Sequence, residues 1–261
     1  AYQQSDSDQL YRKYDIDSTA VSSLYQHSSS YLWIEKQQLK DQAFLALKFI
    51  ADSADHGLDP DDYHLDLLQQ LDPAQNEADI QPFELLLSDG MVKLLHDMSS
   101  GRLDPTVVDP KWSIPRKSFD AVLFLQSALS GDHFKDSLNS LIPASKQYQL
   151  LKASAARYQK IIDLGDWENI PPTPELRQGD SHQNISAIRN RLALEDENLG
   201  FPRPSKFSYF DTELKQSVQR LQRRYSLKDD GIIGPATLRA MNISSRKRLQ
   251  QIVINMERLR W

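Results

Sequence analysis

Two histidines and four aspartates in one short segment are residue types that could bind a metal ion. The histidines are His56 and His64, and the neighbouring aspartates are Asp55, Asp59, Asp61 and Asp62. Imidazole and carboxylate groups are common metal ligands. However, a spacing of eight residues does not place both histidines on one helical face, and Gly57 and Pro60 interrupt the segment. We therefore interpret the segment as structural and expect chelation to leave its stability unchanged.

A second group of carboxylates, Asp229 and Asp230, could act as a general acid and base or begin a calcium loop. A calcium loop needs alternating oxygen ligands and a late glutamate, whereas Gly231 is followed by Ile, Ile, Gly and Pro. Neither pattern is complete, so we interpret this pair as the start of a turn. The residues predict no metal site and no cofactor.

Basic residues gather in the last third of the chain, although the whole chain is acidic. They are Arg220, Arg223, Arg224, Arg246, Lys247 and Arg248. Two interpretations stay open, because most surface charges are simply solvated. The alternative is a contact with a carboxylate-bearing ligand, in which arginine holds the carboxylate and Tyr225 stacks on a sugar or peptide face.

Bulk composition excludes several classes of protein. The chain has 261 residues, enough for two domains, with 39% hydrophobic and 26% charged residues and a formal net charge of -5. The chain has no excess of basic residues that would indicate nucleic acid as a partner. It also has no apolar run that approaches the ~18 residues of a membrane span. The absence of cysteine excludes disulfides and a cysteine nucleophile. The first residues lack the features of a signal peptide, which fits either a mature end after cleavage or a cloning boundary.

Sparse glycine and helical spacing of apolar residues predict a mainly α fold. Residues 1–30 are polar and predict a partly ordered lead-in, and residues 31–170 predict a helical scaffold domain. Helices are expected in that domain at residues 39–50, 83–98, 121–129 and 148–162. We expect Gly101 to end the second of these in a left-handed C-cap.

Prolines at residues 171–174 predict a stiff linker to a second domain at residues 175–243. Two apolar triplets there have the same helical spacing: Ile185, Ile188 and Leu192, then Val218, Leu221 and Tyr225. Each triplet follows an aspartate suited to N-capping, Asp180 or Asp211. This near-repeat predicts a small three-helix module. Residues 244–261 predict a connecting helix with a serine cap.

The loop at residues 229–238 carries the most specific local pattern (DDGIIGPATL). Asp230 and Gly231 predict a tight turn, and we expect Gly234 to adopt a positive φ or to allow a close approach. Pro235 suits the first position of a helix. Ile233 and Leu238 are expected to pack the loop on the core.

Several motifs in this domain agree in order with one family. Residues 176–180 (LRQGD), 221–225 (LQRRY) and 229–242 together closely resemble the three-helix peptidoglycan-binding domain. The family usually has phenylalanine where this chain has Leu221, a conservative core exchange. The resemblance implies a binding site that contains Gln222, Arg224, Tyr225, Asp230, Gly231, Ile232, Gly234 and Thr237.

Motifs upstream extend the resemblance over residues 31–261. Residues 54–64 (ADHGLDPDDYH), 100–105 (SGRLDP) and 109–112 (DPKW) look like the scaffold domain of large Gram-negative L,D-transpeptidases. In that family a catalytic domain with a Ser-His-Gly-Cys motif follows. Transpeptidation needs a thiolate, so this chain without cysteine is expected to be no enzyme itself and to be separated from its catalytic part.

The resemblance implies that the chain positions a catalytic domain on peptidoglycan for cross-linking, and so serves cell-wall biogenesis and cell shape. The expected partners are peptidoglycan and its own catalytic domain, in the periplasm, with or without a membrane anchor on the parent transferase. Met256, Leu259 and Trp261 would then be apolar surface left by a severed domain contact. Two alternatives stay open: a protein-interaction scaffold braced by the three-helix module, and a stand-alone peptidoglycan hydrolase such as a muramidase.

Overall fold

Helices form most of the chain, as the sequence predicts, and the computed structural model describes residues 4–26, 28, 30–108, 110–115, 117–195 and 208–261. The chain divides into two units by its contacts. Residues 1–155 and 252–261 form the first, here called the N-terminal unit, and residues 156–251 form the inserted unit. The inserted unit therefore interrupts the sequence of the N-terminal unit.

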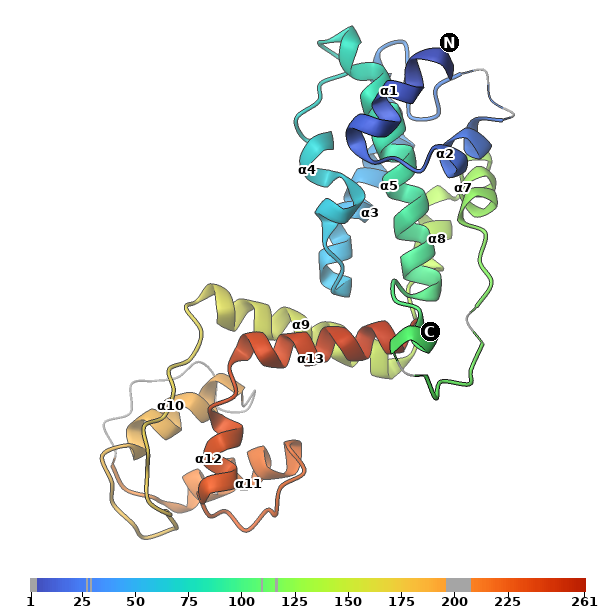
Figure 1. The fold of residues 1–261 in the computed structure, drawn as a ribbon. Coiled ribbons are helices and arrows are strands. Elements are labelled where there is room, and N and C mark those ends of the chain that lie inside the picture. Colours follow the sequence, from blue (N-terminus) through green and yellow to red (C-terminus); the bar gives the residue numbers. More distant parts are fainter. Residues whose placement is uncertain (1–3, 27, 29, 109, 116, 196–207) are drawn as a thin grey trace. The chain divides into compact units, whose positions relative to one another are not determined.

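The centre of the N-terminal unit is α5 (Ile80–Ser100), which packs against α2, α3 and α7 (Figure 1). The consecutive residues Leu85, Leu86 and Leu87 are all fully buried, so α5 is covered on several faces. The other helical elements are α1 (Gln4–Tyr14), α2 (Ser18–Tyr25), η1 (Ser53–His56), α3 (Asp41–Asp52), η2 (Pro60–Tyr63), α4 (Leu65–Leu68), η3 (Glu77–Asp79), α6 (Pro105–Val108), α7 (Ala121–Ser130) and α8 (Phe134–Asn139). Three of the four helices predicted for residues 31–170 therefore exist as α3, α5 and α7, and the fourth, predicted at residues 148–162, exists as α9 (Lys146–Asp163).

The lead-in predicted for residues 1–30 is more ordered than expected. Its described residues form α1 and α2, and Val21, Leu24 and Tyr25 are buried in the core. Asp17 caps α2 by accepting hydrogen bonds from the backbone of Thr19 and Ala20. Tyr11 of α1 and Val21, Leu24 and Tyr25 of α2 thus dock these helices in the core.

A buried carboxylate holds the next segment on α5. Glu84 accepts hydrogen bonds from the Tyr25 hydroxyl at 2.7 Å and from the Trp33 backbone at 3.1 Å. Burial raises the pKa of Glu84 to about 7, although these hydrogen bonds favour its charged form. The hairpin of β1 (Ile34–Glu35) and β2 (Gln38–Leu39) follows, with Ile34 opposite Leu39.

The C-terminal end of α13 (Ser245–Arg258) belongs to the N-terminal unit and is well buried there. The Arg260 side chain is only 1% exposed, and it donates hydrogen bonds to the His56 carbonyl at 3.0 Å and to the Tyr148 hydroxyl at 3.2 Å. Met256 is fully buried and Trp261 is half-buried. The expectation that Met256, Leu259 and Trp261 form exposed surface was therefore wrong for Met256, because the unit itself covers it, whereas Leu259 and Trp261 are partly exposed.

Two glycines of the upstream motifs make room for this segment. A Cβ atom at Gly57 would lie 2.9 Å from Val253, and one at Gly101 would lie 2.4 Å from the Trp261 ring. Gly57 ends η1 in the left-handed conformation. Gly101 ends α5 with a positive φ of 77° but an extended ψ of 154°, so the left-handed C-cap predicted for it does not form.

The two histidines considered as ligands lie in separate hydrogen bonds. His56 Nδ1 is 3.0 Å from the Tyr148 hydroxyl, and Lys152 donates to His56 Nε2 at 3.1 Å. Burial, helped by Lys152, lowers the pKa of His56 to about 4. His64 Nε2 is 2.6 Å from Asp89 Oδ2. These contacts agree with the structural interpretation of the segment.

The inserted unit contains α10 (Ile185–Glu195), α11 (Thr212–Arg224) and α12 (Pro235–Met241), with α10 packed on α11 (Figure 1). Both predicted triplets meet in its core, where Ile185, Ile188, Leu192, Val218 and Leu221 are buried. Tyr225 packs against this core and is half-buried. The expected pair of facing apolar stripes is therefore confirmed.

The division between the units differs from the predicted linker at residues 171–174. It falls within α9 (Lys146–Asp163) and within α13. The second half of α9 joins the inserted unit because the Tyr158 hydroxyl donates to Glu195 Oε1 at 2.9 Å. Ile170, next to the prolines, is buried, and Asn242 bonds both its amide and its carbonyl group.

Only one of the two predicted aspartate caps forms. Asp211 accepts a hydrogen bond from the Leu214 backbone at the start of α11. Asp180 instead accepts one from the Arg177 backbone at 2.8 Å, in a turn that ends before α10 begins. Asp180 is therefore not the cap of α10, because additional residues separate it from the helix.

Candidate functional site

The loop between α11 and α12 is built around one buried amide, that of Gln222. Its side chain is 1% exposed. Its Nε2 donates to the Ile232 carbonyl at 3.0 Å, to Asp230 Oδ1 at 3.1 Å and to Thr237 Oγ1 at 3.2 Å. Its Oε1 accepts from the Gly231 backbone at 2.8 Å. One side chain thus satisfies four groups of the loop and fixes its shape.

The predicted Asp-Gly turn is present at the start of this loop. Asp230 Oδ1 accepts a hydrogen bond from the Ile232 backbone at 3.0 Å, and Gly231 has a φ of 73°. Hydrogen bonds, first of all from Ile232, hold the pKa of Asp230 below its ordinary value. Gly234, in contrast, has an extended backbone with a φ of -94°. Neither the positive φ nor the close approach predicted for Gly234 is present, since a Cβ atom there would lie 3.9 Å from its nearest neighbour, Glu175 Oε2, and the positive φ belongs to Gly231.

The far side of the loop is held by the domain core. Ile233 is 1% exposed and pairs with Leu176 through backbone hydrogen bonds of 2.9 and 3.2 Å. Leu238 is partly buried against the same core, and Pro235 begins α12. The predicted anchoring of the loop by Ile233 and Leu238 is confirmed.

Arg224 and Tyr225 point to a different cluster, centred on Glu195. The Tyr225 hydroxyl donates to Glu195 Oε1 at 2.6 Å, and Arg224 donates to the Glu195 carbonyl at 2.9 Å. Burial opposes the charge of Glu195, which is 3% exposed, but Arg191 and the hydrogen bonds from Tyr225 and Tyr158 together hold the pKa of Glu195 below its ordinary value. Burial raises the pKa of Tyr225.

One face of the Tyr225 ring is already covered. The Arg248 guanidinium lies over it at 3.8 Å from the ring centre. The sugar-stacking hypothesis therefore cannot use that face of Tyr225. Of the eight predicted site residues, the loop brings together Gln222, Asp230, Gly231, Ile232, Gly234 and Thr237, whereas Arg224 and Tyr225 belong to the Glu195 cluster.

Glu195 is a residue that sequence reasoning missed. Its i,i+4 spacing from Arg191 on one predicted helix could have indicated an ion pair. Nothing in the sequence, however, indicates that the hydroxyls of Tyr158 and Tyr225 converge on the same carboxylate oxygen.

The surface of the loop carries exposed ion pairs. Arg223 lies 3.2 Å from Asp229, and Lys228 lies 3.5 Å from Asp230. By sequence, the inserted unit has sixteen lysines and arginines against twelve aspartates and glutamates, a formal charge of +4. The N-terminal unit has fifteen against twenty-four, a formal charge of -9. The basic residues in the last third of the chain therefore lie in the inserted unit, whose net charge is opposite in sign to that of the N-terminal unit.

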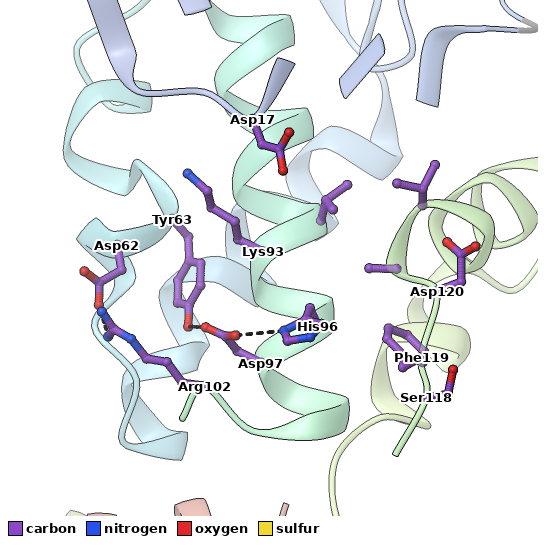
Figure 2. A pocket seen from close by; sticks show the side chains of 13 residues that line it. Asp17, Asp62, Tyr63, Lys93, His96, Asp97, Arg102, Ser118, Phe119 and Asp120 are labelled. Carbon is purple, nitrogen blue, oxygen red and sulfur yellow. Dashed lines mark hydrogen bonds and ion pairs between the residues drawn. The ribbon is translucent and has the colours of Figure 1, made fainter. Parts of the chain in front are cut away.

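A separate pocket of about 690 Å³ lies in the N-terminal unit, beside α5 and η2 and next to the start of α7 (Figure 2). Its polar wall includes Asp62, Lys93, His96, Asp97 and Arg102. The sequence did not predict this pocket, because its walls come from segments far apart in the chain and share no spacing pattern.

Comparisons with known families agree with both units. Residues 19–154, more than half of the chain, match the family model described as "Scaffold domain". The chain belongs to this family. Residues 181–241 match the model described as "Putative peptidoglycan binding domain". The Gln222 loop lies within that match, which supports a cell-wall binding role and peptidoglycan as a partner.

No curated protein matches the chain. Among the residues that the structure describes, no helix is both long enough and apolar enough to cross a membrane.

Proposed function

We propose that this chain is the scaffold and peptidoglycan-binding region of an L,D-transpeptidase and that it holds a catalytic domain on the cell wall. The observation that carries the proposal is the rigid Gln222 loop, inside the peptidoglycan-binding match and in the same chain as the Scaffold domain. The proposal places the chain outside the cytoplasmic membrane, where peptidoglycan lies, and gives the parent protein a role in wall cross-linking.

The proposed mechanism is localisation. A module that binds the wall weakly raises the local concentration of substrate for a domain attached to it, without a change in the chemistry. Peptidoglycan stems carry carboxylates, and the formal charge of +4 on the inserted unit suits them. The exposed ion pairs of Arg223 and Lys228 can exchange partners at small cost, since such pairs contribute only ~0–1 kcal/mol.

The proposal assigns the chemical step to another domain. A transpeptidase takes an acyl group onto a thiolate, and this sequence contains no cysteine. Incubation of the chain with purified sacculi should therefore release no muropeptides. Release of sugar fragments would instead favour a hydrolase and remove the proposed division of labour.

Cosedimentation with purified sacculi tests the wall-binding part. The chain should be enriched in the pellet, and Gln222→Leu, which removes the amide that shapes the loop, should reduce the enrichment. Gln216→Leu, an exposed position on the same helix, is the matched control. Equal recovery with an unrelated protein of the same net charge would refute wall binding.

The transpeptidase part needs a different test. The coding sequence that carries this chain should also encode a domain with a Ser-His-Gly-Cys motif. A complete open reading frame without such a domain would rule out this parentage while leaving wall binding intact.

A second candidate, a protein-interaction scaffold, is favoured by exposed apolar side chains in the N-terminal unit. Leu103, Val107 and Ile114 are 49%, 78% and 59% exposed and lie close together in sequence. This role predicts saturable binding of a separately purified catalytic domain. Replacement of Val107 by serine should weaken that binding, and replacement of the exposed Leu123 on α7 should not.

A further inference from the structure

The pocket of the N-terminal unit has the size of a ligand site. Its volume of about 690 Å³ lies within the ~300–1,000 Å³ typical of small-molecule sites. Apolar contact is provided by Val92, Phe119 and Val122, next to the charged wall (Figure 2). A mixture of apolar surface with a few convergent polar groups is the usual composition of such sites.

One wall of the pocket is fixed by close packing of α5 on η2. A Cβ atom at Gly90 would lie 2.4 Å from the Tyr63 carbonyl oxygen, so the helix lies directly on this backbone. Tyr63 is 1% exposed, and its hydroxyl donates to Asp97 Oδ2 at 3.0 Å. His96 Nδ1 is 3.2 Å from the other oxygen of Asp97. The carboxylate is thus held in one orientation at the pocket wall.

Two other wall segments are held by the C-terminal end of the chain. The Leu103 backbone, next to Arg102, donates to Glu257 Oε1 at 2.9 Å. Lys117, next to Ser118, donates to the Arg260 carbonyl at 3.1 Å. The pocket is therefore preorganised by the buried core of the unit, which reduces the entropy lost when a ligand binds.

The pocket presents charges of both signs at its opening. Arg102 pairs with Asp62, and the two side chains are 49% and 38% exposed. Asp17 and Asp120 are exposed and use Oδ1 to cap α2 and α7. Lys93 pairs with the buried Asp89 at 2.7 Å. A guanidinium can accept a ligand carboxylate as a bidentate partner, and the capping carboxylates can accept a ligand ammonium.

We propose that this pocket binds a short peptide that carries both a free carboxylate and a free amine, as an uncross-linked peptidoglycan stem does. Arg102 holds the carboxylate, Asp120 and Asp17 face the ammonium, and Val92, Phe119 and Val122 contact the short aliphatic side chains. The assignment to a wall peptide rests on the proposed function, whereas the requirement for both charges rests on the pocket.

Calorimetric titration of the whole chain with a soluble disaccharide-tetrapeptide, released from sacculi by a muramidase, tests the proposal. Wild type should show saturable binding. Arg102→Gln should weaken it roughly tenfold or more, about the effect of losing one charge-assisted contact. Lys48→Gln removes a more exposed ion pair outside the pocket, that of Lys48 with Asp52 on α3, and should bind like wild type.

Asp120→Asn probes the other charge without loss of the helix cap, since asparagine caps as well as aspartate. It should weaken the same muropeptide at least about threefold. Acetylation of the ligand amine should weaken binding to wild type at least as much, and it should have a smaller effect on Asp120→Asn, in which only Asp17 still faces the ammonium. These ligand changes keep the test valid even if a protein variant folds poorly.

Three outcomes would overturn the pocket proposal: no saturable binding of the muropeptide, wild-type affinity of Arg102→Gln, or equal affinity for the acetylated ligand. Equal binding of an ordinary tetrapeptide with the same charges would overturn the assignment to the wall. Sacculus cosedimentation of the wild-type chain separates the two proposals. Wall binding by a wild-type chain that fails to bind the muropeptide leaves the proposed function standing and removes only the pocket site.

Discussion

The two units use buried glutamates in opposite ways. Glu84 in the N-terminal unit accepts hydrogen bonds from neutral groups, and burial raises its pKa to about 7. Glu195 in the inserted unit lies 3.1 Å from Arg191, and its pKa is lowered despite similar burial. The comparison teaches that a nearby cation, rather than depth, decides which protonation state a buried carboxylate prefers.

The units also differ in where their polar groups point. In the inserted unit the amide of Gln222 turns inward and shapes a loop whose exposed ion pairs form the surface. In the N-terminal unit Arg102 and Asp62 stay half-exposed at a pocket. A residue that identifies a family can therefore act by fixing the shape of a loop from inside.

The largest expected effect concerns the anchor of the N-terminal unit. Arg260→Met leaves Glu257 and the His56 carbonyl without their buried partner, and should lower the free energy of unfolding by about 3 to 5 kcal/mol. The exposed neighbour Arg258→Met should cost less than about 0.5 kcal/mol. Urea denaturation measures both, and similar losses for the two variants would show that burial of Arg260 is unimportant.

The second effect is a pH dependence that belongs to Glu84. Its pKa is raised from 4.5 to about 7, so the folded state keeps a proton that the unfolded state releases. The stabilisation from the protonated carboxyl is fully present below pH 4.5 and is lost as the pH rises through about 7, which lowers the free energy of unfolding by about 3 kcal/mol. The free energy of unfolding, measured with urea at pH 4.5 and at pH 8, should lose in Glu84→Gln the part of its pH dependence that Glu84 causes. An identical pH dependence in the variant would contradict the assignment.

A third, smaller effect is expected in the inserted unit. Gln222→Leu leaves the Gly231 amide without its partner, which should cost about 2 kcal/mol, whereas the exposed Gln216→Leu should cost little. Amide exchange of Gly231, followed by NMR, should accelerate in the first variant only. Unchanged protection of Gly231 would mean that Gln222 does not shape the loop.

The smallest expected effect is on wall retention. Arg223→Gln removes an exposed cation whose pair with Asp229 contributes ~0–1 kcal/mol, so folding should be unchanged. Sacculus retention should fall by about twofold and should also weaken in high salt, because exposed charges are screened. Salt-independent retention would show that the charge of +4 on the inserted unit plays no part.

Local patterns determined much of the inserted unit. Helical spacing placed Ile188 and Val218 in one core, Asp211 caps α11 as its residue type favours, and Pro235 begins α12. These features depend on residues within a few positions of each other, and local propensity and periodicity describe such effects well.

Tertiary contacts decided the rest. The order of α2 depends on packing against α5, and the burial of Arg260 depends on His56, which lies far away in sequence. Gly231 rather than Gly234 takes the positive φ because Gln222 holds the Gly231 amide. The sequence alone therefore determined the helices that have a clear apolar spacing and the family that they resemble. Only the tertiary structure decided which polar groups form buried hydrogen bonds and which line a pocket. Those groups come from segments far apart in the chain, so local spacing in the sequence does not predict that they meet.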